Sequence, residues 1–170
     1  MLDDTLIMKR FRQAYGDRAF ADARIPLYIV ATDFRSGEKV VLSEGRLVDA
    51  IRASIAIPFI FEPWPVGDRL LIDGFMSDPL PVDVAIKEGA HVIIAVGFES
   101  PYQARMNSAA RFAFQVTTIM SNNLLNANYA FHNLAHHTEI IPIIPEFNQR
   151  IKAFDTSKLP LCAHFPGKVL

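Results

Sequence analysis

The sequence predicts an α/β fold in which buried strands alternate with helices. The continuous apolar, β-branched run at 25–32 has the composition of a strand buried on both faces, and 91–96 has that of another such strand. Residues 69–73 are predicted to form a strand that ends in an aspartate. Apolar residues recur at three- and four-residue steps over 47–55, and 81–89 begins with proline and ends with glycine. Both features are typical of helices.

The N-terminal region is expected to form a helix followed by a β-hairpin. Acidic and capping residues at 3–5 start a helical apolar spacing, and the helix should end at 15–17. Turn-forming residues at 35–38 separate the strand at 25–32 from a shorter strand at 39–42. These two strands should pair as a hairpin.

The middle of the chain has the pattern of a βαβ unit. Pro58 should end the preceding helix, and 59–65 is too rich in proline for a regular element. The strand at 69–73, the helix at 81–89 and the strand at 91–96 then follow in order. This order predicts parallel strands joined by a right-handed crossover.

The C-terminal part is expected to contain a long helix and an edge strand. Residues from about 105 to 137 contain neither proline nor glycine and carry apolar residues at helical spacing. They predict one long helix, or two helices joined near 121–123. The apolar run at 139–145 contains two prolines, which confine it to the edge of a sheet.

Composition excludes several classes of protein. The 170 residues are 51% apolar, which is ordinary for a globular domain, and the formal net charge of −1 disfavours a nucleic-acid partner. The single Cys162 forms no internal disulfide, and with His164 it makes no zinc pattern. Apolar stretches such as 55–61 are too short to span a bilayer, and no signal peptide is evident. The expected location is cytoplasmic or peripheral to a membrane.

Asp73 is the first candidate functional residue, because it ends a predicted strand and is followed by Gly74. Open α/β sheets place reactive groups at the carboxyl ends of their strands. An ordinary aspartate that caps the turn would look the same, so the surrounding motifs decide between the two. These motifs are IVATD at 29–33, RASIAIPFIF at 52–61, LIDG at 71–74, PLPV at 79–82 and GAHVIIAV at 89–96.

In this order and at these intervals, the motifs resemble the second half of the patatin-like phospholipase family. Residues 140–145 and Phe154-Asp155 resemble the closing strand and short terminal helix of that family. The resemblance implies a three-layer α/β/α fold with a mostly parallel central sheet. Residues 1–170 would be the C-terminal portion of a single such domain, with its N-terminal part missing.

The resemblance also implies chemistry by a Ser-Asp dyad without histidine, with Asp73 as the base and Gly74 as the turn of the Asp-Gly motif. A serine hydroxyl is a poor nucleophile until a base accepts its proton, and backbone N–H groups must bind the developing oxyanion. No serine here lies in a Gly-x-Ser-x-Gly elbow, and no glycine cluster resembles the oxyanion loop. We therefore expect part of a lipid acyl hydrolase, acting on ester bonds of phospholipids or other acyl lipids and inactive alone.

The chain departs from the family pattern beside Asp73. Phe75 stands where the family usually has glycine or alanine, and Asp78 stands where it often has asparagine. Phe75 is therefore a candidate for the lining of an acyl pocket, together with Pro58 and Phe59. For these two residues, in the apolar stretch before Trp64, the alternatives are core packing and contact with a membrane interface.

Other polar residues have weaker functional interpretations. Ser54 is expected to be a packing residue, Asp33 to make turn hydrogen bonds, and Arg52 to pair with a helix carboxylate. His132 and His136, with the adjacent His137, have a spacing that could share a metal, but a solvated helix face explains them better. No metal or cofactor is expected.

The alternative function is non-catalytic: a half-domain that binds lipid or a partner protein. Such a half-domain would need its sheet edge covered, either by the missing N-terminal half or by self-association, because exposed apolar edges drive association. A nucleotide-binding α/β protein is disfavoured, because the chain lacks a glycine-rich phosphate loop.

Overall fold

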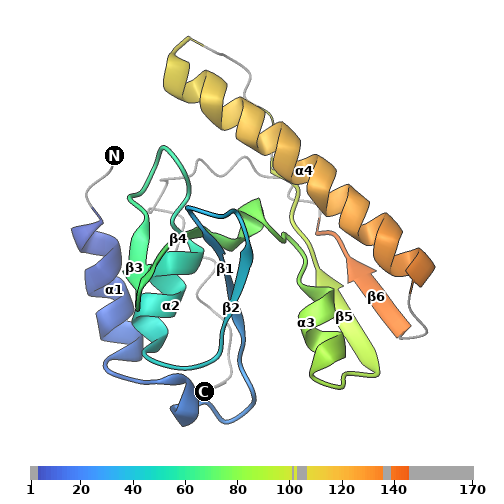
Figure 1. The fold of residues 1–170 in the computed structure, drawn as a ribbon, viewed down its shortest axis with the longest axis horizontal. Coiled ribbons are helices and arrows are strands. Elements are labelled where there is room, and N and C mark those ends of the chain that lie inside the picture. The colour runs from blue at the N-terminus through green and yellow to red at the C-terminus, as the bar shows by residue number, and fades with distance from the viewer. Residues whose placement is uncertain (1–3, 101, 103–106, 136–138, 146–170) are drawn as a thin grey trace.

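The computed structural model describes residues 4–100, 102, 107–135 and 139–145 of the chain (Figure 1). The helices are α1 (Thr5–Tyr15), α2 (Leu47–Ser54), α3 (Val82–Lys87) and α4 (Ala109–Ala135), with two short 3₁₀ helices, η1 (Phe20–Asp22) and η2 (Gly74–Met76). The strands are β1 (Ile29–Asp33), β2 (Lys39–Leu42), β3 (Trp64–Val66), β4 (Arg69–Asp73), β5 (Val92–Val96) and β6 (Glu139–Ile143). The α/β class predicted from the sequence is confirmed.

The described strands form two sheets. The larger one has four strands in the order β2-β1-β4-β3, and all of its neighbours are antiparallel. The predicted hairpin is confirmed, since β1 pairs with β2 in a register that places Thr32 opposite Lys39. The smaller sheet has two strands, β5 and β6, which are parallel.

Strand pairing corrects two expectations. Parallel pairing was expected to dominate, but among the described strands it is confined to β5 and β6. The prediction that 69–73 and 91–96 are parallel neighbours is wrong, because β4 has β1 on one side and β3 on the other. No edge of β4 is left for β5.

Strand β3 was not predicted, because Pro65 lies in its middle. A proline has no N–H to donate, so strands tolerate it at the edge of a sheet, where one side needs no partner. β3 occupies such an edge and pairs only with β4, with Pro65 opposite Leu70.

Helix α2 packs on one face of the larger sheet, whereas α3 lies beside β5 (Figure 1). On the α2 face, Ala31 and Leu71 are fully buried and pack with Ala53. Successive residues of a strand point to opposite faces, so Thr32 and Lys39 point away from α2. Lys39 Nζ donates to the Asp83 carboxylate of α3 at 2.6 Å, which ties α3 to that face. The larger sheet therefore has a helix packed on its α2 face, while α3 is joined to the opposite face through the Lys39–Asp83 ion pair.

Among the described residues, the β5–β6 sheet is covered on one of its two faces. Its inner face packs through Ile93 and Ala95 against Leu125 of α4. On the outer face of β5, Val92, Ile94 and Val96 are 57%, 64% and 45% exposed. The apolar run at 91–96 was predicted to be buried on both faces, and the structure corrects this for one of them.

Helix α4 is one continuous helix of 27 residues, which decides between the two predicted alternatives. Its Asn122 is buried and forms two hydrogen bonds with the backbone of Ser100. The Asn122 side chain accepts from the Ser100 N–H at 3.1 Å and donates to the Ser100 carbonyl at 3.0 Å. Within the part of the chain that the structure describes, no helix is long and apolar enough to cross a membrane.

Candidate active site

Asp73 lies at the end of β4, where the sequence predicts it. Its N–H donates to the Ala56 carbonyl at 3.1 Å, which joins the strand end to the segment that follows α2. Its side chain caps η2, because Oδ1 accepts from the Phe75 N–H at 2.9 Å. This bond fixes the direction of the carboxylate relative to the turn.

Gly74 is required at this turn because the neighbouring strand approaches too closely for a side chain. A Cβ at position 74 would overlap the backbone carbonyl of Val30 on β1. Neither backbone can retreat easily, since Asp73 is paired with Ala31 in the sheet. The Asp-Gly motif therefore has a steric reason independent of any chemistry.

The environment of Asp73 suits a proton acceptor. Burial raises the pKa of its carboxyl above the ordinary value of 3.8, and the Phe75 N–H opposes this shift only in part. The second carboxylate oxygen, Oδ2, has no hydrogen-bond partner among the described residues. A raised pKa makes a carboxylate a stronger base, and a free oxygen can accept a proton.

The turn after Asp73 is held by side chains of the larger sheet. Thr32 Oγ1 donates to the Asp73 carbonyl at 2.8 Å and lies 2.8 Å from Ser77 Oγ. The Asp78 N–H donates to the Gly74 carbonyl at 2.9 Å, which closes the turn on itself. We call residues 73–78 the Asp73 turn.

Asp78 is buried, with 8% of its surface exposed, and three groups donate hydrogen bonds to its carboxylate. Lys39 Nζ donates to its Oδ2 at 2.8 Å, and Asn128 of α4 donates to its Oδ1 at 2.9 Å. The Leu80 N–H also donates to Oδ1, at 3.1 Å. The sequence analysis identified Asp78 as a departure from the family pattern but did not identify Lys39.

Pro58 and Phe59 lie in the turn that follows Ala56, next to the Asp73 backbone. Phe59 has a φ of 68°, a left-handed conformation that is unfavourable for a bulky side chain, and 59% of its surface is exposed. Pro58 and Phe75 are half-buried. Strained backbone of this kind persists where surrounding structure enforces it and is often found at functional sites.

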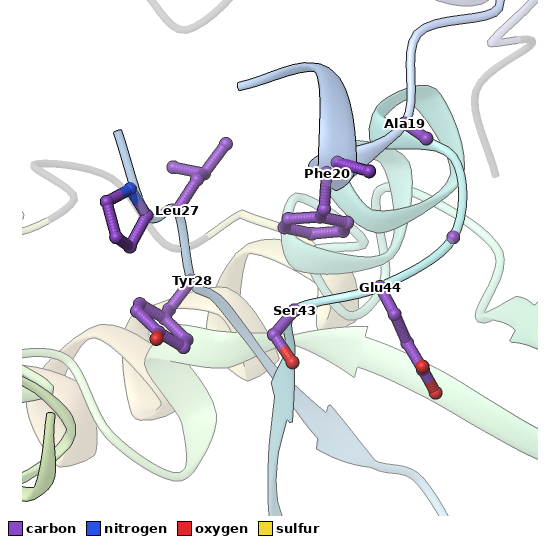
Figure 2. Close-up of a pocket in the computed structure, with 9 residues that line it drawn as sticks. Ala19, Phe20, Leu27, Tyr28, Ser43 and Glu44 are labelled. Atoms are coloured by element: carbon purple, nitrogen blue, oxygen red, sulfur yellow. The ribbon is translucent and has the colours of Figure 1, made fainter. Parts of the chain in front are cut away.

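A cavity among the described residues lies away from Asp73 (Figure 2). Its volume is about 310 Å³, and it opens beside the chain that enters β1. The lining residues are Ala19, Phe20, Ala21, Pro26, Leu27, Tyr28, Ser43, Glu44 and Gly45. None of the candidates Pro58, Phe59, Asp73 and Phe75 lines this cavity.

Several predictions for other polar residues can be compared with the structure. Asp33 makes the predicted turn bonds, accepting from the N–H groups of Arg35 at 2.8 Å and Ser36 at 3.1 Å, and these bonds lower its pKa. Ser54 ends α2 and is half-buried.

The histidine and C-terminal predictions lie largely outside the described residues. These are His136, His137, the side chain of His132, Phe154-Asp155, Cys162 and His164. Among the residues that the structure does describe, no group of three potential metal ligands is found.

Arg52 is confirmed as the partner of a helix carboxylate. It is 1% exposed, and its Nε and Nη2 both lie 2.8 Å from Asp4 Oδ2 at the start of α1. Its guanidinium also lies about 5 Å from the ring centroids of Phe61 (5.1 Å) and Trp64 (5.0 Å). These contacts join α1, α2 and β3, and none of them involves Asp73.

Comparison with known proteins identifies the family of the chain. The family model for patatin-like phospholipase matches residues 1–86, a stretch that contains the whole larger sheet and the Asp73 turn. The chain belongs to the patatin-like phospholipase family, which supports a domain of the lipid-hydrolase type.

Relatives match about half of the chain. The chain is 42% identical over 90 residues to an NTE family protein of Mycobacterium tuberculosis, which is 53% of this chain and 25% of that protein. It is 33% identical over 84 residues to patatin-like phospholipase domain-containing protein 7 of Rattus norvegicus, which is 48% of this chain and 6% of that protein. The matched region thus spans a quarter or less of the length of these relatives.

Proposed function

We propose that this chain is the C-terminal portion of a patatin-like domain that hydrolyses carboxylic esters of phospholipids or other acyl lipids, and that Asp73 is its base. One observation carries the proposal: the Asp73 carboxylate is fixed through one oxygen, its pKa is raised by burial, and its other oxygen is free among the described residues. Family membership supports the ester-hydrolase chemistry.

In the proposed reaction, Asp73 Oδ2 accepts the proton of a serine hydroxyl while the serine oxygen attacks the ester carbonyl carbon. Collapse of the tetrahedral intermediate breaks the bond to the alcohol oxygen, and Asp73 returns the proton to that oxygen. Water then cleaves the acyl-serine bond by the same route, which releases a fatty acid and restores the serine.

The serine and the oxyanion donors come from outside these 170 residues, since the chain contains no Gly-x-Ser-x-Gly elbow. We propose that the remainder of the patatin-like domain, on the same or another polypeptide, carries them and covers the outer face of β5. This face supports the proposal because Val92, Ile94 and Val96 are exposed there, and a two-stranded sheet is marginal by itself.

Phe59 and Phe75 are proposed to contact the acyl chain. Phe75 follows Asp73 by two residues, and its N–H is already bonded to the Asp73 carboxylate. Phe59 is held in a strained conformation with its ring exposed, which is consistent with a contact to lipid or to a membrane surface. The cytoplasmic or membrane-peripheral location stays a prediction.

The experiment that tests the proposal uses a polypeptide that contains this chain together with the elbow. Replacing Asp73 by asparagine should lower fatty-acid release from a phosphatidylcholine substrate by at least about a thousandfold, because the serine loses its base. Asp33→Asn is the matched control, since Asp33 also ends a strand of the same sheet but only caps a turn. Equal activity of the Asp73 variant and the control would exclude Asp73 as the base.

The second candidate is a non-catalytic half-domain that binds lipid or a partner protein. The observation that favours it is the bare outer face of β5 in a chain without a nucleophile. Sedimentation of the chain with phosphatidylcholine vesicles, and its mass in solution, would test this candidate. A monomer that stays in the supernatant when the vesicles sediment would count against it.

A further inference from the structure

Two side chains of neighbouring strands contact opposite ends of the Asp73 turn. Thr32 of β1 and Lys39 of β2 are directly opposite each other in the hairpin. Directly opposed residues of an antiparallel pair point to the same face of the sheet. Both side chains therefore project from the face opposite α2, toward the turn and α3.

Thr32 holds the first residue of the turn. Its Oγ1 donates to the Asp73 carbonyl at 2.8 Å and meets Ser77 Oγ at 2.8 Å. Thr32 is itself buried, with 3% of its surface exposed. A buried hydroxyl with two partners has few alternatives, so this contact restricts the Asp73 backbone.

Lys39 holds the last residue of the turn. Its Nζ lies 2.8 Å from Asp78 Oδ2 and 2.6 Å from Asp83 Oδ1, and the pKa of Lys39 is raised by these two carboxylates against the effect of burial. Asp78 is 8% exposed, so its charge needs a cation at close range. Asn128 adds a third anchor from α4.

Between these two points the turn has little freedom. The Ser77 and Asp78 N–H groups both donate to the Gly74 carbonyl, at 3.2 Å and 2.9 Å, and the Phe75 N–H donates to Asp73 Oδ1. A displacement of Asp78 would therefore be transmitted through Gly74 and Phe75 to the carboxylate of Asp73.

We infer that Thr32 and Lys39 are positioning residues, a two-point clamp that holds both ends of the Asp73 turn and so fixes the direction of the Asp73 carboxylate. The inference rests on the proposed function only for the use of that carboxylate as a base. Neither side chain contacts the carboxylate itself, so both act through the turn.

The first test measures hydrogen exchange of the Phe75 and Asp78 amides by NMR in the 170-residue chain. Lys39→Met leaves the charge of Asp78 without its cation, and both amides should exchange at least about tenfold faster, as the loss of one hydrogen bond predicts. Lys39→Arg should retain most of the protection. Thr32→Val should accelerate exchange at Phe75 more than at Asp78.

A double variant separates positioning from general destabilisation. Asp78→Asn keeps the acceptor for Leu80 and Asn128 but removes the charge that Lys39 neutralises. Lys39→Met combined with Asp78→Asn should therefore recover most of the protection at Phe75. Lys87→Met is the matched control, because Lys87 also contacts Asp83 but is 74% exposed.

The second readout is the pKa of the Asp73 carboxyl, followed by its ¹³C chemical shift. The Phe75 N–H lowers this pKa in the native chain, so Lys39→Met should raise it, and the double variant should restore it. Unchanged exchange at Phe75 and an unchanged Asp73 pKa in Lys39→Met and Thr32→Val would overturn the inference. Because none of these measurements needs ester hydrolysis, failure of the clamp and failure of the proposed function are distinguishable.

Discussion

The two sheets differ in how much of their apolar surface the chain covers. The four-stranded sheet has α2 on one face and the Asp73 turn on the other, and Leu71 at its centre is fully buried. The β5–β6 sheet has α4 on one face, while Ile94 on the other is 64% exposed. The four-stranded sheet thus has a core completed by the chain itself, whereas the β5–β6 sheet has an apolar face that the described residues leave exposed.

The largest expected effect concerns Arg52, whose buried contacts join α1, α2 and β3. Arg52→Ala should lower the free energy of unfolding by about 4 kcal/mol, because it removes a buried ion pair and the packing between two aromatic rings. Urea unfolding checks this value. Arg46→Ala is the control, since Arg46 is 51% exposed in its contact with Asp17 and should cost no more than about 0.5 kcal/mol.

The next effect compares the two sheets directly. Leu71→Ala should cost about 3 kcal/mol in unfolding free energy, because it leaves a cavity in the core of the larger sheet. Ile94→Ala should cost less than about 1 kcal/mol in this chain, because most of that side chain is already in water. Equal losses would mean that β5 is covered in solution, contrary to the structure.

A smaller effect tests the turn that places Asp73. Gly74→Ala should cost about 2 kcal/mol, because the new methyl group meets the Val30 carbonyl and one strand must shift. Gly37→Ala provides a matched control, since it has a φ of 76° but open space around it and should cost about 1 kcal/mol. A cost at Gly74 no larger than at Gly37 would contradict the close approach of β1 and β4.

The smallest effect has the opposite sign. The raised pKa of Asp73 means that its ionisation favours the unfolded chain: the penalty is absent below the unfolded value of 3.8 and grows as the pH rises through the folded value. Asp73→Asn should therefore be more stable than the native chain at about pH 7 and lose this advantage at about pH 3. A loss of stability at about pH 7 would show that burial does not disfavour the ionised carboxylate of Asp73.

Local patterns predicted the elements and the candidate base. The hairpin of β1 and β2, helix α2 and strand β4 with Asp73 at its end all depend on residues close in sequence. The steric need for glycine at position 74 agrees with the Asp-Gly motif, although its cause, the Val30 carbonyl, lies on another strand. Spacing and turn chemistry carry this kind of information well.

The parts that were not predicted depend on distant partners. Pro65 disfavours a strand until its edge position is known, and β4 cannot pair with β5 because β1 and β3 occupy both of its edges. The bond between Lys39 and Asp78 joins residues that are 39 positions apart. No local pattern shows such contacts, because they arise only when the strands have been arranged in the sheet.

We propose that Asp73 activates a serine supplied by the rest of the domain. The most direct measurement is covalent labelling of that serine by a fluorophosphonate probe, with an elbow-bearing half-domain mixed with this chain and the adduct identified by mass spectrometry. We expect rapid labelling with the native chain and little labelling with the Asp73→Asn chain. Equal labelling with both chains would contradict it.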